Sequence, residues 1–179
     1  MPAYNLRRLS VLVVERHHLM RRLMKDVIQA LGINSIELCS SHELLETDTT
    51  IFKPDIIFVD WSAGCDGLDL LQRVRSNAAE FDRFIPVVMV TAYTGFKQVC
   101  AARDAGVTEF LAKPITATAI YRRLSAMIEN PRDFIESVDF FGPDRRRREI
   151  EPAGPERRAT EIEKHRGVVW RRQQEAAAS

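Results

Sequence analysis

Hydrophobic positions in the first 130 residues fall into five short runs, separated by longer stretches that mix apolar and polar residues. The runs occupy residues 9–14, 33–38, 55–59, 85–90 and 107–111. Most of them are apolar at consecutive positions, so both faces of the segment are hydrophobic. Strands buried on both faces are typical of a parallel sheet covered by helices. The pattern therefore predicts five parallel strands.

Apolar side chains between these runs recur at helical spacing. The predicted apolar helix faces are Leu19, Leu23, Val27, Ile28 and Leu31; then Leu68, Leu71 and Val74; then Ile120, Leu124 and Ile128. Gly32 follows the first of these stretches, where a glycine can end a helix. Regular alternation of strand and helix predicts an α/β fold with a doubly wound five-stranded parallel sheet. In that architecture, functional groups gather beyond the carboxyl ends of the strands.

The pattern changes near Asn130. Residues 142–166 contain few large apolar side chains and many charges. Such a segment buries too little surface to offset the entropy lost on ordering. We therefore predict a folded domain over residues 1–130 that contains every strand, and a largely disordered extension over 131–179. Phe140 and Phe141 are exceptions within the extension, and we expect them to pack against the domain because an exposed aromatic pair is costly.

Composition narrows the function classes. The chain has 179 residues, with 26 basic and 25 acidic side chains and a net charge of +1, which does not favour a general polyanion binder. Three scattered cysteines without metal-ligand spacing indicate a reducing compartment. No apolar run reaches membrane-spanning length, and the first ten residues lack the apolar segment of a signal peptide. The expectation is a cytoplasmic protein without membrane insertion.

Polar side chains stand where the predicted strands end. Glu15 and Arg16 follow the first run, Asp60 follows the run at 55–59, Thr91 follows the next run, and Lys113 follows the last one. Because the carboxyl ends of parallel strands share one edge of the sheet, these side chains are expected to meet there. A carboxylate, a hydroxyl and a lysine are a suitable set for phosphoryl chemistry.

Four motifs, in order and spacing, resemble the receiver domain of CheY-like response regulators. They are "VLVVERHHLMRRLM", "DIIFVDWSAGCDG", "VVMVTAY" and "AGVTEFLAKPI", and the resemblance covers residues 8–129. It implies that Asp60 is at the phosphoacceptor position and that Thr91 and Lys113 contact the phosphoryl group. It also implies that Glu15 and Asp60 help to hold a magnesium ion, and that Phe110 is at the aromatic switch position.

Two departures from that family's pattern affect the metal. Arg16 stands where the family has a second acid, and a guanidinium there repels magnesium and is able to pair with Asp60. The loop after Asp60 also looks one residue short and lacks the usual proline. Two interpretations remain: Asp60 is still phosphorylated by a histidine kinase, or the pocket is degenerate and the domain is a scaffold. Both departures weaken metal binding, so the scaffold interpretation is favoured.

The extension contains a repeated unit. Gly142-Pro143-Asp144 and its arginines return twelve residues later as Gly154-Pro155-Glu156 and its arginines. We interpret each Gly-Pro pair as a turn. Residues 142–158 hold six arginines, no lysine and four acids, a net charge of only +2. Exclusive use of arginine favours planar, bidentate contacts over general phosphate binding.

One acid beside several arginines suits guanine, whose O6 and N7 atoms accept an arginine fork and whose N1 and N2 atoms donate to a carboxylate. Two such units suit a molecule with two guanines and two phosphates, such as cyclic di-GMP. The predicted nucleotide-binding residues are Asp144, Arg145, Arg146, Arg147, Arg148, Glu156, Arg157 and Arg158. A solvated charged tail and a nucleic-acid arm remain as alternatives.

A receiver with an arginine-rich C-terminal extension resembles the Cle group of CheY-like cyclic di-GMP effectors. The resemblance implies that the extension binds the nucleotide and that the protein docks to a partner such as the flagellar motor. The expected function is therefore that of a signalling adaptor and not of an enzyme. A phosphorylation-driven regulator and a nucleic-acid binder are the alternatives.

Overall fold

The computed structural model describes residues 4–40, 52–62, 67–76, 82–92 and 95–145, together with the backbone of 163–165. The helices are a 3-10 turn at Leu6–Arg8, α1 at His18–Ala30, α2 at Gly67–Arg75, α3 at Phe96–Asp104 and α4 at Ala117–Glu129. The strands are β1 at Ser10–Val14, β2 at Ser35–Cys39, β3 at Ile56–Trp61, β4 at Val87–Thr91, β5 at Glu109–Ala112, β6 at Phe134–Ser137, β7 at Phe140–Pro143 and β8 at Glu163–His165.

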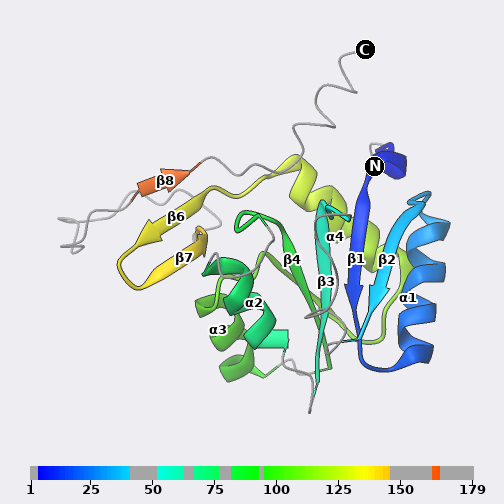
Figure 1. The fold of residues 1–179 in the computed structure, drawn as a ribbon, viewed down its shortest axis with the longest axis horizontal. Coiled ribbons are helices and arrows are strands. Elements are labelled where there is room, and N and C mark those ends of the chain that lie inside the picture. The colour runs from blue at the N-terminus through cyan, green and yellow to red at the C-terminus, as the bar shows by residue number, and fades with distance from the viewer. Residues whose placement is uncertain are drawn as a thin grey trace.

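The first five strands form one parallel sheet in the order β2-β1-β3-β4-β5, which confirms the fold predicted from the alternating pattern. Helices α1 and α4 cover one face of the sheet, and α2 and α3 cover the other (Figure 1). Successive residues of β1 supply both layers, because Val11 and Val13 join one core cluster while Leu12 and Val14 join the other. None of the described helices is long and apolar enough to cross a bilayer.

Helix α1 departs from its predicted face. Met24 and Ile28 are its buried side chains, whereas Leu19 and Leu23 are 70% and 45% exposed. The predicted apolar face therefore coincides only in part with the buried face of the helix. The spacing of apolar residues shows that a helix has an apolar face. It does not show which part of that face packs against the sheet. Gly32 ends the helix as expected, with φ +89° and its amide donating to the carbonyl of Gln29.

The expectation that every strand precedes Asn130 is wrong. Strands β6 and β7 form an antiparallel hairpin, and β8 pairs antiparallel with the other edge of β6. This small sheet lies beside the first, above α2 and α3 (Figure 1). The proposed domain boundary at residue 130 stays a prediction. The first fifteen residues of the extension, 131–145, are nevertheless joined to the receiver by direct contacts.

Candidate functional site at the carboxyl edge of the sheet

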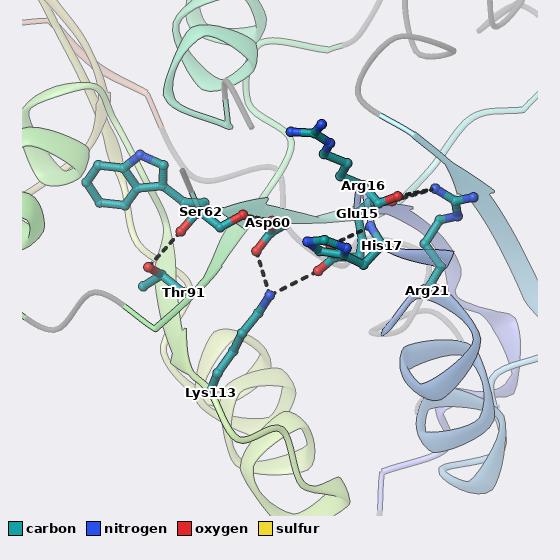
Figure 2. A network of polar contacts seen from close by, with 9 residues as sticks. Glu15, Arg16, His17, Arg21, Asp60, Ser62, Thr91 and Lys113 are labelled. Carbon is teal, nitrogen blue, oxygen red and sulfur yellow. Dashed lines mark hydrogen bonds and ion pairs between the residues drawn. The ribbon is translucent and has the colours of Figure 1, made fainter. Parts of the chain in front are cut away.

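Glu15, Asp60, Thr91 and Lys113 meet at one edge of the sheet, as the sequence predicts (Figure 2). Glu15 directly follows β1, Asp60 is in β3, Thr91 is the last residue of β4 and Lys113 directly follows β5. The parallel register places Asp60 opposite Val90 and Trp61 opposite Thr91. Both carboxylates are almost fully buried, with 1% of each residue exposed.

Lys113 bridges the two carboxylates. Its Nζ donates to Asp60 Oδ1 at 2.7 Å and to Glu15 Oε2 at 3.1 Å. Burial by itself lowers the pKa of the Lys113 ammonium, but hydrogen bonds and charge interactions with Asp60 and Glu15 outweigh burial and raise that pKa above its ordinary value. The lysine is therefore charged at neutral pH and neutralises one of two buried negative charges.

The other carboxylate oxygens also have protein donors. The Ser62 hydroxyl donates to Asp60 Oδ2 at 2.5 Å, and the His17 amide donates to Glu15 Oε1 at 2.9 Å. A magnesium ion would share these oxygens with their protein donors, because each carboxylate oxygen has a second lone pair. Among the described residues, no group of three or more His, Cys, Asp or Glu side chains is placed to hold a metal. Glu15 and Asp60 are thus the two described carboxylates that could bind the ion, and whether they bind it stays a prediction.

Lys113 is the basic side chain that pairs with Asp60 at Oδ1, and pairing of Arg16 with Asp60 stays a prediction. Figure 2 shows the Arg16 side chain extending away from Lys113, while its backbone carbonyl accepts from the Arg21 guanidinium at 3.2 Å. The same nitrogen of Arg21 donates to the Glu15 carbonyl at 2.7 Å. Arg21 thus fixes the backbone that carries Glu15 and Arg16, a role that the sequence did not indicate.

Thr91 is 2% exposed, and its hydroxyl donates to the Trp61 carbonyl at 2.9 Å. Phe110, from the next strand, is half-buried and packs against the core cluster that includes the α2 side chains. Gly67 begins α2 directly beneath Asp60, where a Cβ atom would lie 2.4 Å from the Asp60 carbonyl oxygen. Only glycine allows this approach, so α2 starts in backbone contact with the site.

The extension differs from its prediction at the first repeat. Gly142 and Pro143 are not a turn but the buried end of β7, paired with Ile135 and Phe134. A proline fits this edge position because a strand at the edge of a sheet needs no outward amide donor. Arg145 forms an ion pair with Asp104 in the receiver. The remaining predicted ligand residues lie outside the described residues: Arg146, Arg147, Arg148, Glu156, Arg157 and Arg158.

The hairpin is attached to the receiver by an aromatic cluster at the amino edge of the sheet. Phe84, Phe134 and Phe141 have ring centroids 5.1–5.5 Å apart, and the Arg83 guanidinium lies 3.4 Å from the Phe141 centroid. Packing of Phe141 against the domain is thereby confirmed. Phe140 instead contacts Arg145, whose guanidinium carbon lies 4.2 Å from the centroid of the Phe140 ring.

Arg75 is at the centre of this attachment, a role that no sequence pattern indicated. Arg75 is 4% exposed. Its guanidinium donates to the carbonyls of Gly106, Arg83 and Ile85 at 2.9, 2.6 and 2.8 Å. It also lies 5.1 Å from the Phe134 ring centroid. Burial lowers the pKa of Arg75 to about 9, against the opposing charge of Asp82. The side chain is charged at neutral pH, and the dipoles of the three carbonyl groups stabilise its charge.

A doubly wound sheet with two buried carboxylates and a bridging lysine at its carboxyl edge defines the class of receiver-like α/β proteins. Residues 11–125 match the family profile described as the response regulator receiver domain, and the chain belongs to that family. It is 32% identical over 124 residues to chemotaxis protein CheY-3 of Vibrio cholerae, which covers 68% of this chain and 92% of the relative.

Chemotaxis protein CheY of Pseudomonas aeruginosa is 29% identical over 122 residues, covering 68% of this chain and 97% of that protein. Among solved structures, a response regulator from Thermotoga maritima has a TM-score of 0.56 at 21% identity, covering 68% of this chain and 98% of its own. CheY4 of Vibrio cholerae has a TM-score of 0.55, also at 21% identity, with 65% and 96% covered. At these identities, the structural matches support the fold alone.

Proposed function

We propose that this protein is a signalling adaptor, and not an enzyme, that binds cyclic di-GMP through the arginine-rich extension of a CheY-like receiver. The observation that carries the proposal is the repeated Gly-Pro-acid-arginine unit, whose first copy is joined to the receiver by the hairpin of β6 and β7. A ligand held by the extension would therefore act on a segment in direct contact with the receiver core.

The chemistry of each unit suits one half of a two-fold nucleotide. An arginine fork matches guanine O6 and N7, a carboxylate matches guanine N1 and N2, and further arginines match the phosphates. The first half-site consists of Asp144 and Arg145–Arg148, and the second of Glu156, Arg157 and Arg158. Nucleotide binding by these residues rests on their chemistry and on the repeat.

The described part of the first unit has a fixed starting point. The Asp144 amide donates to the Asp133 carbonyl at 2.7 Å, and the Arg132 guanidinium donates to the carbonyls of Thr108 and Asp144. These bonds therefore hold the backbone at Asp144 in one position where the chain leaves the hairpin. Preorganisation of this kind lowers the entropy cost of binding, which supports the unit as a ligand-binding element even though Gly142 and Pro143 are not a turn.

Docking to a protein partner is the expected output. Relatives of this chain are named chemotaxis proteins, and we propose a partner of the flagellar motor switch type. Ordering of the extension by the nucleotide would change the surface that the receiver presents to that partner.

The decisive test is titration of the full-length protein with cyclic di-GMP, GTP and a DNA oligomer, monitored by calorimetry. We expect cyclic di-GMP to bind most tightly. Asp144→Asn separates guanine recognition from bulk electrostatics, because loss of a negative charge strengthens any polyanion binder but removes an acceptor for guanine. Arg146→Lys keeps the charge and loses the fork, so each variant should weaken binding about tenfold or more.

Tighter binding by Asp144→Asn, or no change with Arg146→Lys, would refute guanine recognition. Preference for DNA over cyclic di-GMP would instead establish the extension as a nucleic-acid arm. Equal, weak binding of all three probes would leave a solvated charged tail as the correct description.

Phosphorylation of Asp60 is the second candidate function. It is favoured by one observation, the assembly of Asp60, Thr91 and Lys113 at the edge of the sheet. Incubation with a small phosphodonor and magnesium chloride should leave the protein largely unmodified, because Arg16 stands where the family has a second acid and a guanidinium repels the metal. Arg16→Asp supplies another acid and should raise phosphate uptake. Rapid stoichiometric labelling of the unaltered protein would establish the phosphorylated regulator.

A further inference from the structure

Asp104, the last residue of α3, lies between two arginines from different parts of the chain. Its Oδ1 atom accepts from Arg103 Nε at 3.2 Å and Nη2 at 3.1 Å, and it is 3.2 Å from Arg145 Nη1. An acid at the C-terminus of a helix is unfavourable, because the negative end of the helix dipole is there. The carboxylate is stabilised at this position by the two guanidinium groups that face it.

The position of Arg145 is set by packing and does not depend on the ion pair alone. Its guanidinium lies 4.2 Å from the centroid of the Phe140 ring, in β7. Strand β7 is held against the end of α3 by backbone contact, since a Cβ atom on Gly142 would lie 2.8 Å from the Gly106 Cα atom. The two guanidiniums therefore reach the same Oδ1 atom from the end of α3 and from the chain just after β7.

Two converging guanidiniums around one oxygen suit a phosphate as well as a carboxylate. The Arg103 and Asp104 side chains are 48% and 50% exposed, and that of Arg145 is 40% exposed, so a dissolved anion can reach all three. Exposed ion pairs are weak, on the order of 0–1 kcal/mol, so exchange of Asp104 for another anion is feasible.

We propose that Arg103 and Arg145 form a phosphate subsite of the cyclic di-GMP site, and that Asp104 occupies this subsite when no ligand is bound. The inference rests on the proposed function, and it adds to it a receiver residue, Arg103, and an internal competitor, Asp104. Ligand binding replaces the Asp104 carboxylate at Arg145, so the end of α3 changes its charge partners when the extension binds.

The test compares the affinity of full-length variants for two probes, cyclic di-GMP and inorganic pyrophosphate, by calorimetry at low salt. Asp104→Asn removes the competitor and should tighten binding of both probes by about two- to fivefold. Arg103→Gln removes a phosphate donor and should weaken binding of both by about three- to tenfold. Loss of any negative charge favours anion binding, so the result specific to competition is a tightening beyond that of a matched charge loss elsewhere.

Matched controls come from α1, on the opposite side of the molecule (Figure 1). Asp26→Asn and Arg22→Gln make the same changes in charge at exposed positions. If Asp104→Asn tightens binding no more than Asp26→Asn, the effect is one of net charge and the subsite is wrong. An Arg103→Gln affinity equal to that of Arg22→Gln would also overturn it.

The two probes separate this inference from the proposed function. Absence of cyclic di-GMP binding by the unaltered protein refutes the proposed ligand. In that case pyrophosphate still tests the subsite, which stands if Asp104→Asn tightens pyrophosphate binding and Arg103→Gln weakens it beyond their controls. It fails if pyrophosphate affinity does not respond to either change.

Discussion

The two edges of the parallel sheet each hold a cation, half-buried at one edge and buried at the other, and its partners are different groups. At the carboxyl edge, Lys113 is bonded to two carboxylates, Asp60 and Glu15. At the amino edge, Arg75 donates to three backbone carbonyls and lies against the Phe134 ring.

A compact ammonium serves as a point charge between two acids, whereas a planar guanidinium connects several backbone segments at once. The first arrangement pairs side chains with one another. The second joins α2, the chain before β4, the chain before β5 and the C-terminal hairpin into one unit. The difference separates a carboxyl edge made of paired side chains from an amino edge made of backbone contacts, and the following variants compare the two.

The largest effect is expected from Phe134→Ala. Phe134 is 1% exposed and contacts Phe84, Phe141 and Arg75, so its removal leaves a cavity beside a buried charge. The free energy of unfolding should fall by about 3–5 kcal/mol in a urea titration. Phe96→Ala, at an 83% exposed position, is the control and should change little. An equal loss at both positions would mean that the hairpin is not part of the folded core.

Arg75→Met should rank next. Methionine fills much of the volume but leaves the carbonyls of Gly106, Arg83 and Ile85 without their donor, so the free energy of unfolding should fall by about 2–4 kcal/mol. Arg73→Met changes the same residue type on the same helix at a more exposed position and serves as the control. Comparable stability of the two variants, measured by urea unfolding, would remove Arg75 as the link between receiver and hairpin.

Lys113→Met should cost about 1–3 kcal/mol at neutral pH, because it leaves two buried carboxylates with less compensation. The pKa of Lys113 is raised in the folded protein, so its stabilising effect is fully present below the ordinary lysine pKa, about 10.4, and is lost as pH rises through the higher folded value. Unfolding titrations from pH 7 to 11.5 should show the two proteins converging at the alkaline end. Lys97→Met, at an exposed position, controls for general alkaline destabilisation, and a gap that widens with pH would contradict the prediction.

The smallest effect concerns the Arg83–Glu136 ion pair at the amino edge, where the nitrogen–oxygen distance is 2.8 Å. Glu136→Gln should change the free energy of unfolding by less than about 1 kcal/mol, since the pair is partly exposed. Arg83→Lys keeps the charge but loses the planar stack on Phe141, so it should destabilise more. The reverse order, measured by thermal unfolding at matched salt, would show that charge pairing dominates at this edge as it does at the other.

Sequence patterns were sufficient to predict the residues at the carboxyl edge of the sheet. They were insufficient to predict those at the amino edge. The strands were predictable because apolar runs of that length have few other arrangements, and Asp60, Thr91 and Lys113 follow from where those strands end. Arg75 was not predictable, because its hydrogen bonds to backbone carbonyls depend on where three chain segments meet and leave no residue pattern in the sequence. Gly142-Pro143 was misread because a Gly-Pro pair favours a turn locally, while its strand pairing depends on residues in Phe134–Ser137.

The exposed Leu19 and Leu23 illustrate the same limit, because helical periodicity shows that an apolar face exists but not how the helix is rotated over the sheet. Arg103 and Asp104 were missed for another reason. Adjacent opposite charges at the end of a surface helix are common, and only the position of Arg145 in space makes this pair distinctive.

Strand β8 has a consequence for how this chain can vary among its relatives. It pairs with β6 on the side opposite β7, so the chain leaves the small sheet at Pro143 and re-enters it at Glu163. Strands two apart in a sheet are about 10 Å from each other. The entropy cost of joining two such points rises only with the logarithm of the intervening length, by about 0.6 kcal/mol for each doubling. Insertions and deletions between the two arginine units should therefore be tolerated by folding, so the fold itself does not set their spacing.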